Sequence, residues 1–346
     1  MRTYKNLYSQ IVSFENLLYA YREFSRGKRF KTDILDFNYG YEKELFKLQE
    51  ELVNHTYTPL APHRFYVYEP KKRAIEAAAV RDRVVHHALC RVVEPIFDKR
   101  FIYDTYACRL NKGTLAAIKR FESFKRKAMA RYGRDKVYVL KADISKYFEN
   151  IDHTILLGLI GERIKDKNVI WLVGRIFNPG DRSCPLAKGI PIGNLTSQFF
   201  ANLYLNPLDQ FVKHDLRIKC YVRYMDDFVL VDSSRTRLHE AKAEIARFLE
   251  EKLDLRLHPK KQAITPLRCG IDFLGFRIFP AHRFLRKENA RRFIRRLKKM
   301  KRQFEEKDIT LARVSASIKG WLAHAKHGDT YKLRKNILRD FVLTPV

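Results

Sequence analysis

The chain has 346 residues and a formal net charge of +30, because 69 Lys and Arg residues outnumber 39 Asp and Glu residues. Its 46% hydrophobic content excludes an intrinsically disordered tail and a collagen-like fibre. It contains no apolar run of about 18 residues, so we expect no transmembrane helix. Its first residues lack the continuous apolar centre of a signal peptide. The charge favours nucleic acid as the partner, with an anionic membrane surface as the second candidate.

The first part of the chain combines helices with one hairpin. Residues 64–80 alternate apolar and polar side chains around Pro70, which is typical of two antiparallel strands. The helix that precedes residue 98 is expected to end near Pro95, because proline interrupts helical hydrogen bonding. Helical spacing of apolar residues predicts helices within residues 1–54, with a distinct pattern at 41–53, and over residues 82–97 and 114–132.

The remaining part alternates strands and helices before a basic end. One apolar strand runs into Asp143, and two later strands flank the segment Met225–Asp227. This order of strand, helices, strand and strand is that of a ferredoxin-like sheet. From residue 281 on, the chain is predicted to be helical, with 19 Lys and Arg against 6 Asp and Glu. Strands are predicted over residues 137–144, within 220–231, and over 261–265 and 273–278, and helices over 153–177, 196–213 and 237–253.

Three carboxylates are expected to meet at one edge of this sheet. Asp143 ends its strand, and Asp226 and Asp227 occupy the tip of the hairpin. Like charges cluster only where cations neutralise them, and oxygen ligands select Mg²⁺ or Mn²⁺ over zinc. Two such ions, roughly 3.5–4 Å apart, can activate a hydroxyl and stabilise a leaving pyrophosphate, which is nucleotidyl transfer. The alternative is an ordinary Asp-containing turn, although the apolar flanking strands disfavour it.

The sequence Tyr224-Met225-Asp226-Asp227 resembles the YxDD signature of reverse transcriptases. Further blocks appear in the order typical of that family over roughly residues 60–330. Residues 81–98 and 103–121 are similar to finger blocks of group II intron-type enzymes, 139–153, 189–211 and 255–278 to palm blocks, and 321–328 to a thumb segment.

This resemblance implies an α+β fold of the right-hand polymerase type. The expected domains are a helical N-terminal extension (1–54), fingers (55–136), a ferredoxin-like palm with the catalytic carboxylates (137–280) and a basic helical thumb (281–346). The implied activity is RNA-directed DNA synthesis by a cytoplasmic enzyme that a bacterium, an archaeon or a phage encodes.

The resemblance also implies metal ligands at the palm. Asp143 and Asp226 would bind two Mg²⁺ ions, for which Mn²⁺ is a possible substitute. Asp227 would support them, and the main-chain carbonyl of Ile144 would be a further ligand.

Other matching residues would face the incoming nucleotide. Lys71 and Arg73 in the finger hairpin would contact the triphosphate, although a solvated basic turn is the alternative. Lys261 would donate a proton to pyrophosphate, but Lys260 beside it leaves the assignment open. Phe148, five residues after Asp143, would leave no room for a 2′-hydroxyl and so favour deoxynucleotides.

The block at 192–198 departs from the usual reverse transcriptase pattern. Ile192 replaces a Gln and Gln198 replaces a Pro, and this form, which includes Gly193, resembles enzymes of diversity-generating retroelements that copy RNA with errors at adenines. Isoleucine cannot form the hydrogen bonds that a Gln could offer to a nucleotide. Apolar walls discriminate by only about 1–3 kcal/mol, so we expect looser selection unless another group compensates.

The expected partners are nucleic acids and nucleotides. They comprise template RNA, a primer or cDNA, deoxynucleoside triphosphates and, by resemblance, a small helical accessory protein, with no membrane. Two alternatives stay open: a retron-like, abortive-infection or CRISPR-associated reverse transcriptase, and a non-catalytic RNA-binding scaffold. The residues expected to bind nucleic acid are Tyr224, Met225, Arg291, Arg292, Arg295, Lys298 and Lys299.

Overall fold

A computed structural model describes residues 2–68, 72–177, 188–339 and 341–343. The chain forms two compact units, each assembled from separate segments. The boundaries expected for fingers, palm and thumb are a functional division that stays a prediction. The first unit comprises residues 1–117, 142–228 and 240–262, and the second comprises residues 118–141, 229–239 and 263–346.

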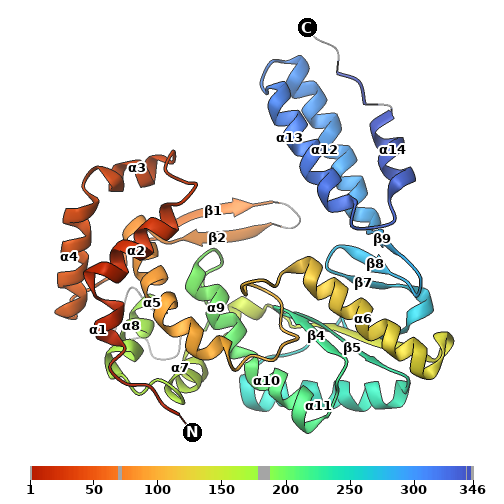
Figure 1. Cartoon of the computed structure of the whole chain (residues 1–346), viewed down its shortest axis with the longest axis horizontal. Coiled ribbons are helices and arrows are strands. Elements are labelled where there is room, and N and C mark those ends of the chain that lie inside the picture. Colours follow the sequence, from red (N-terminus) through yellow and green to blue (C-terminus); the bar gives the residue numbers. More distant parts are fainter. Residues whose placement is uncertain (1, 69–71, 178–187, 340, 344–346) are drawn as a thin grey trace. The chain divides into compact units, whose positions relative to one another are not determined.

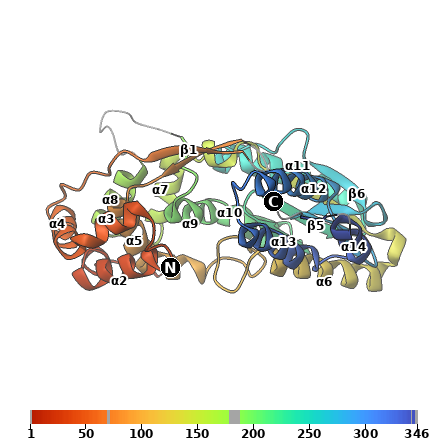
Figure 2. The same ribbon diagram turned by 90° about the horizontal axis from the view of Figure 1, so that it is seen from above.

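The N-terminal helices of the first unit pack on one long helix, α5 (Val80–Asp98). Figures 1 and 2 show α2, α3 and α4 grouped around it. Pro95 lies inside the last turns of α5, which ends at Asp98, close to the end expected from the predicted range 82–97. The helix continues because Val93 and Phe97, on either side of Pro95, are buried in the core. The other helices are α1 (Tyr8–Ile11), α2 (Phe14–Ser25), α3 (Thr32–Tyr39) and α4 (Tyr41–Val53).

The predicted finger hairpin is present. Strands β1 (His63–Val67) and β2 (Arg73–Ala77) pair antiparallel, with Phe65 opposite Ile75 and Tyr66 opposite Ala74. Every residue of β1 is exposed, so this hairpin contributes little to the core.

A four-stranded sheet carries the ferredoxin-like topology that the sequence predicts. Its strands lie in the order β4-β5-β3-β6, which in chain order reads second, third, first, fourth. The edge strand β6 pairs antiparallel with β3, with Val139 opposite Thr265. The strands are β3 (Tyr138–Asp143), β4 (Tyr221–Tyr224), β5 (Asp227–Asp232) and β6 (Ala263–Pro266).

The helices that follow β3 and β5 agree with this topology, but one of the expected helices is divided into two. The single helix expected over residues 196–213 is divided at Leu205, and Pro207 lies in the first turn of the new helix, where proline is tolerated. The observed helices are α7 (His153–Gly161), α8 (Lys167–Phe177), α9 (Leu195–Tyr204), α10 (Asn206–Gln210), a π-helical turn (Phe211–Asp215) and α11 (Arg235–Leu253).

The second unit contains a small sheet and helices that are rich in basic residues. The strand expected over residues 273–278 is a hairpin instead, because Leu274 and Gly275 adopt left-handed backbone angles (φ +46° and +90°) that reverse the chain. A third strand precedes the expected helices. The elements are α6 (Thr114–Tyr132), β7 (Ile271–Phe273), β8 (Phe276–Ile278), β9 (Arg283–Leu285), α12 (Lys287–Glu305), α13 (Leu311–Ala325) and α14 (Tyr331–Arg339).

Helix α12 packs against α13 through an apolar stripe (Figure 1). Phe293, Leu297 and Met300 are buried, and the ring of Phe293 stacks on Trp321 at 4.0 Å between centroids. Ile294, which helical spacing also suggests for the buried stripe, is 36% exposed. Within the described ranges, no helix combines the length and the apolar character that crossing a bilayer requires.

Candidate active site

Two of the three predicted carboxylates meet at the end of β3. The N–H of Ile144, the residue after Asp143, donates a hydrogen bond to the main-chain carbonyl of Asp226 at 3.2 Å. On the other side, the N–H of His258 donates to the carbonyl of Asp143 at 2.7 Å. Asp143 and Asp226 therefore line one cavity of about 590 Å³ within the first unit. Asp227 is not among the described residues that line it.

The turn that carries Asp226 has an unusual backbone. Met225 lies in the left-handed region at φ +54°, where a side chain with a Cβ atom is disfavoured. The strands on either side contain the fully buried Val222 and Phe228. The buried strands thus hold the turn at the sheet edge, beside the end of β3.

The electrostatics of the cavity favour a cation. Burial raises the pKa of Asp226, and the nearby carboxylate of Asp143 raises it further, while Lys261 and Arg73 partly offset this effect. The Nζ atom of Lys261 lies 2.9 Å from Oδ1 of Asp143. The cavity therefore holds two adjacent acidic groups that Lys261 and Arg73 only partly neutralise.

The oxygen donors here fit a hard divalent ion. Two carboxylates and the carbonyl of Ile144 are the ligand types that Mg²⁺ and Mn²⁺ prefer, and such an ion would relieve the repulsion that raises the pKa of Asp226. Among the residues that the structure describes, no group of three or more His, Cys, Asp or Glu side chains is placed to hold a metal ion. The metal-binding roles of Asp143, Ile144, Asp226 and Asp227 stay a prediction.

Several residues expected to contact the nucleotide line the same cavity. Arg73 comes from β2, Phe148 from the turn after β3, and Ile192 from the segment before α9. Gly193 and Gln198 do not line it, and Lys71 lies outside the described residues.

The segment 189–193 is fixed by main-chain contacts. Ile192 accepts a hydrogen bond through its carbonyl from the N–H of Glu76 in β2 at 3.1 Å. A Cβ atom on Gly193, which has φ +125°, would lie 2.9 Å from Cγ2 of Ile75. The glycine therefore permits the close approach to the finger hairpin that places Ile192 at the cavity wall.

The main chain at Phe148 is fixed by a tight turn and by a hydrogen bond from the segment that contains Ile190. It belongs to a short 3₁₀ turn, Tyr147–Glu149, that follows Lys146 in a left-handed conformation. The carbonyl of Phe148 accepts a hydrogen bond from the N–H of Ile190 at 2.8 Å. These contacts fix the main chain of the residue expected to exclude a 2′-hydroxyl.

The sequence analysis missed three basic residues at this cavity: Lys72, Lys146 and His258. Lys72 follows the predicted Lys71, so the run of cations in the hairpin was the available signal. The sequence left Lys260 and Lys261 equivalent, whereas only Lys261 of the two lines the cavity.

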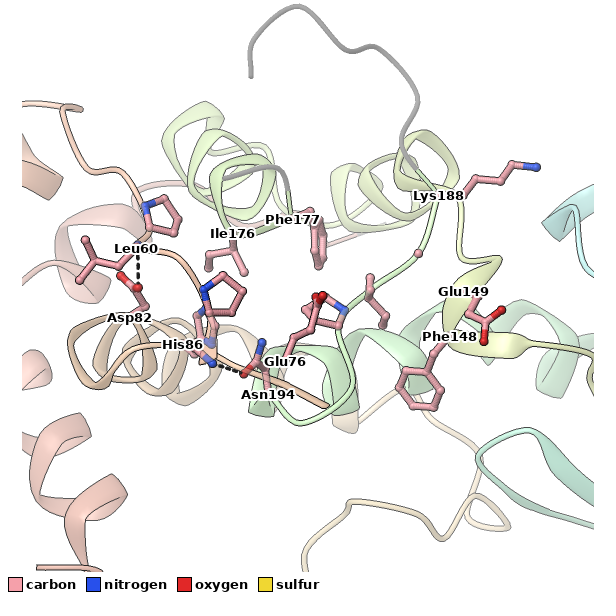
Figure 3. A pocket seen from close by; sticks show the side chains of 16 residues that line it. Leu60, Glu76, Asp82, His86, Phe148, Glu149, Ile176, Phe177, Lys188 and Asn194 are labelled. Atoms are coloured by element: carbon pink, nitrogen blue, oxygen red, sulfur yellow. Dashed lines mark hydrogen bonds between the residues drawn. The ribbon is translucent and has the colours of Figure 1, made fainter. Parts of the chain in front are cut away.

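A second cavity of about 390 Å³ adjoins the first, sharing Glu76, Phe148, Glu149, Ile190 and Pro191 with it. Figure 3 shows Asp82 and His86 from α5 on one side and Ile176 and Phe177 from α8 on another. The carboxylate of Asp82 accepts a hydrogen bond from the N–H of Leu60 at 2.9 Å. Burial lowers the pKa of His86 to about 3, so its imidazole is neutral.

The remaining predicted nucleic-acid contacts divide between two places. Tyr224, before the turn, lies with its hydroxyl 3.3 Å from Oγ1 of Thr114, and Met225 forms the turn itself. The five basic residues of α12 that were predicted to bind nucleic acid lie outside its buried stripe, and all but the half-buried Arg292 are exposed. They are Arg291, Arg292, Arg295, Lys298 and Lys299. Their role in binding nucleic acid stays a prediction.

A ferredoxin-like sheet with paired carboxylates at its edge, faced by a basic hairpin, defines a polymerase of the right-hand class. The family profile "Reverse transcriptase (RNA-dependent DNA polymerase)" matches residues 69–278, which is more than half of the chain. The chain therefore belongs to the reverse transcriptase family. The expected fold and enzyme class, an RNA-directed DNA polymerase, are confirmed at this level.

Curated relatives include proteins of group II introns. The chain is 28% identical over 284 residues to protein YkfC of Escherichia coli, covering 71% of this chain and 72% of that protein. It is 24% identical to the group II intron-encoded protein LtrA of Lactococcus lactis, covering 68% of this chain but only 50% of LtrA. The relationship to group II intron-type enzymes is confirmed, whereas the diversity-generating type stays a prediction.

Solved structures of telomerase also show similarity. One from Candida albicans has a TM-score of 0.48 at 11% identity, covering 74% of this chain and 55% of that chain. One from Candida tropicalis has a TM-score of 0.49 at 12% identity, covering 68% and 52%.

Proposed function

We propose that the protein synthesises cDNA on a template RNA at the cavity of Asp143 and Asp226, with reduced fidelity at template adenines as in diversity-generating retroelements. The observation that supports this proposal is the common cavity of the two carboxylates, Phe148 and Ile192. It joins the acidic pair, the aromatic expected to select the sugar, and the residue that departs from the usual family pattern.

The carboxylates of Asp143 and Asp226, with the carbonyl of Ile144, would hold the divalent ions. When bound, Mg²⁺ ions increase the nucleophilicity of the primer hydroxyl and stabilise the charge of the leaving pyrophosphate. Lys261, close to Asp143, holds a proton at Nζ that it can deliver to pyrophosphate.

The walls of the cavity select and orient the nucleotide. Lys72 and Arg73 supply positive charge for the triphosphate. The ring of Phe148 excludes a 2′-hydroxyl and so favours deoxynucleotides.

Ile192 accounts for reduced fidelity in this proposal. Its side chain lines the cavity but can neither donate nor accept a hydrogen bond. Nucleotide selection at this wall then depends on shape, which discriminates by only about 1–3 kcal/mol.

The proposed partners follow from the activity and the charge. They are template RNA, a primer or cDNA, deoxynucleoside triphosphates and a small helical accessory protein. The net charge of +30 supports binding to nucleic acid, and the affinity is then expected to fall steeply with salt.

Primer extension on a defined RNA, followed by sequencing of the product, tests the proposal. We expect Ile192→Gln and Ile192→Asn to lower misincorporation opposite adenine by about tenfold, equivalent to about 1.4 kcal/mol, with extension retained. Ile190→Val, at another apolar position of the cavity, is the matched control and is expected to leave the error rate unchanged. Equal error rates in all four proteins would remove Ile192 from the account.

A further inference from the structure

A fully buried ion pair lies directly behind the turn that carries Asp226. Arg223 in β4 and Asp209 in α10 both have side chains with no exposed surface. The Nε atom of Arg223 donates to Oδ1 of Asp209 at 2.7 Å, and Nη2 donates to Oδ2 at 2.6 Å. The guanidinium and the carboxylate thus form a two-point contact with defined geometry.

The carboxylate of Asp209 is held by two further donors. The hydroxyl of Tyr221 donates to Oδ1 at 2.8 Å, and the hydroxyl of Thr105 donates to Oδ2 at 2.8 Å. Each carboxylate oxygen therefore receives two hydrogen bonds, so the orientation of Asp209 is fixed. Because buried ion pairs can often be replaced by apolar residues without loss of stability, stability alone does not explain this arrangement.

The remaining nitrogen of Arg223 contacts the turn itself. Its Nη1 atom donates to the main-chain carbonyl of Met225 at 3.0 Å. Met225 has φ +54°, a conformation that persists only where its surroundings fix it. On the other side of the turn, the carbonyl of Asp226 accepts the hydrogen bond from Ile144. The two hydrogen bonds hold consecutive carbonyls of the turn.

We propose that Arg223, oriented by Asp209, is a positioning residue that fixes the main chain of Met225 and thereby directs the carboxylate of Asp226 into the cavity. This inference rests on the proposed catalytic role of Asp226. Arginine suits the task because its planar fork reaches both carboxylate oxygens and the carbonyl at once. A lysine would keep the charge but has no such fixed fork.

Arg223→Lys is the first test, with the natural protein as reference. We expect kcat for primer extension to fall by about 10- to 100-fold, the range for a misplaced catalytic group, while KM for the nucleotide changes by less than about threefold. The chain has four methionines, so ¹³C-methyl labelling gives a simple spectrum. We expect the resonance of Met225, assigned with Met225→Leu, to shift while those of Met129 and Met300 stay in place.

Arg223→Met combined with Asp209→Asn separates positioning from folding. This double variant removes both buried charges, and the Asn oxygen still accepts from Tyr221, so it is expected to unfold near the temperature of the natural protein. We expect its kcat to be as low as that of Arg223→Lys, because neither variant holds the Met225 carbonyl as Arg223 does.

The proposal is overturned if either folded variant retains kcat within about twofold of the natural protein, or if the Met225 resonance is unchanged in both. Failure of the proposed function has a different outcome: Asp226→Asn would then extend primers normally, whatever the Arg223 variants do to the Met225 resonance.

Discussion

Two charged pairs in the first unit differ in how completely their charges are neutralised and their oxygen atoms hydrogen-bonded. Asp209 and Arg223 have opposite charges, no exposed surface and hydrogen bonds to both carboxylate oxygens. Asp143 and Asp226 have like charges, line an open cavity and have Lys261 as a partial counter-ion. The charges of Asp209 and Arg223 neutralise each other without a ligand, whereas a bound cation would reduce the repulsion between Asp143 and Asp226.

The difference indicates that the two pairs have different roles, although they meet at the turn that follows β4. Arg223 connects its buried pair with Asp209 to the turn through the carbonyl of Met225, and Asp226 follows immediately. Damage to the buried Asp209–Arg223 pair should lower activity and, where one charge is left unpaired, stability as well, whereas damage to the acidic pair should lower activity alone. Single substitutions at each pair test this contrast.

The largest effect is expected for Asp226→Asn. The substitution removes one of two charges from the acidic pair while keeping the shape of the side chain. We expect extension in Mg²⁺ to fall by more than about 100-fold, and fluorescence anisotropy should show unchanged binding of template RNA. Activity within about twofold of the natural protein would contradict the metal assignment.

The same substitution, Asp226→Asn, should lower activity without lowering the stability of the protein. Because the pKa of Asp226 is raised above its ordinary value of 3.8, ionisation of this group lowers the free energy of unfolding as the pH rises through that raised pKa. In metal-free buffer at neutral pH, Asp226→Asn should therefore unfold at a temperature no lower than the natural protein. A clear decrease would show that the carboxylate stabilises the turn.

Asp209→Asn alone should cause the largest loss of stability. It leaves the Arg223 charge buried without its counter-ion, which typically costs about 3–5 kcal/mol of unfolding free energy. Urea denaturation measures this loss. The control is Asp254→Asn, which breaks the exposed pair with Lys188 and should lower stability much less, because solvent screens that pair. Equal losses in the two variants would mean that burial does not distinguish these pairs.

Lys261→Ala tests how this lysine affects the acidic pair and whether it donates a proton to pyrophosphate. Lys261 lowers the pKa of Asp226, so its removal should raise that pKa and move the acid limb of the pH–rate profile to higher pH. We also expect kcat to fall by about 100-fold if this residue protonates pyrophosphate. Lys260→Ala is the matched control, since Lys260 is exposed and does not line the cavity. Identical profiles for the two variants would reject the assignment of Lys261.

At neutral pH, His86 gives the smallest expected effect, and this effect grows as the pH falls. Its pKa is about 3 in the folded chain against 6.5 as the ordinary value, so the unfolded chain binds the proton first as the pH falls below 6.5. Stability should then decrease by up to about 1.4 kcal/mol per pH unit. Thermal unfolding of His86→Asn should lack this slope between pH 6.5 and 3, unlike that of the exposed control His239→Asn. An unchanged slope would show that His86 is protonated when folded.

Patterns of alternation and spacing predicted the elements that depend on local sequence. The finger hairpin and the ferredoxin-like strand order follow from such patterns. Other local features did not: the helix expected over residues 196–213 is divided at Leu205. The continuation of α5 past Pro95 depends on the buried neighbours of that residue.

At the candidate site, too, the sequence predicts local features but not those that depend on contacts between distant segments. The carboxylates were visible as residues that interrupt apolar strands, but only the fold distinguishes Lys261 from Lys260. The partnership of Arg223 with Asp209 depends on a contact between a strand and a helix. A charged residue inside the apolar run of β4 was its one sequence signal.

Binding of Mn²⁺, followed by electron paramagnetic resonance, tests most directly the claim that Asp143 and Asp226 together hold divalent ions. The account predicts that Asp143→Asn and Asp226→Asn each weaken Mn²⁺ binding by at least about tenfold, and that Asp227→Asn, outside the cavity lining, weakens it less. Equal Mn²⁺ affinity in the natural protein and in both the Asp143 and Asp226 variants would contradict the account.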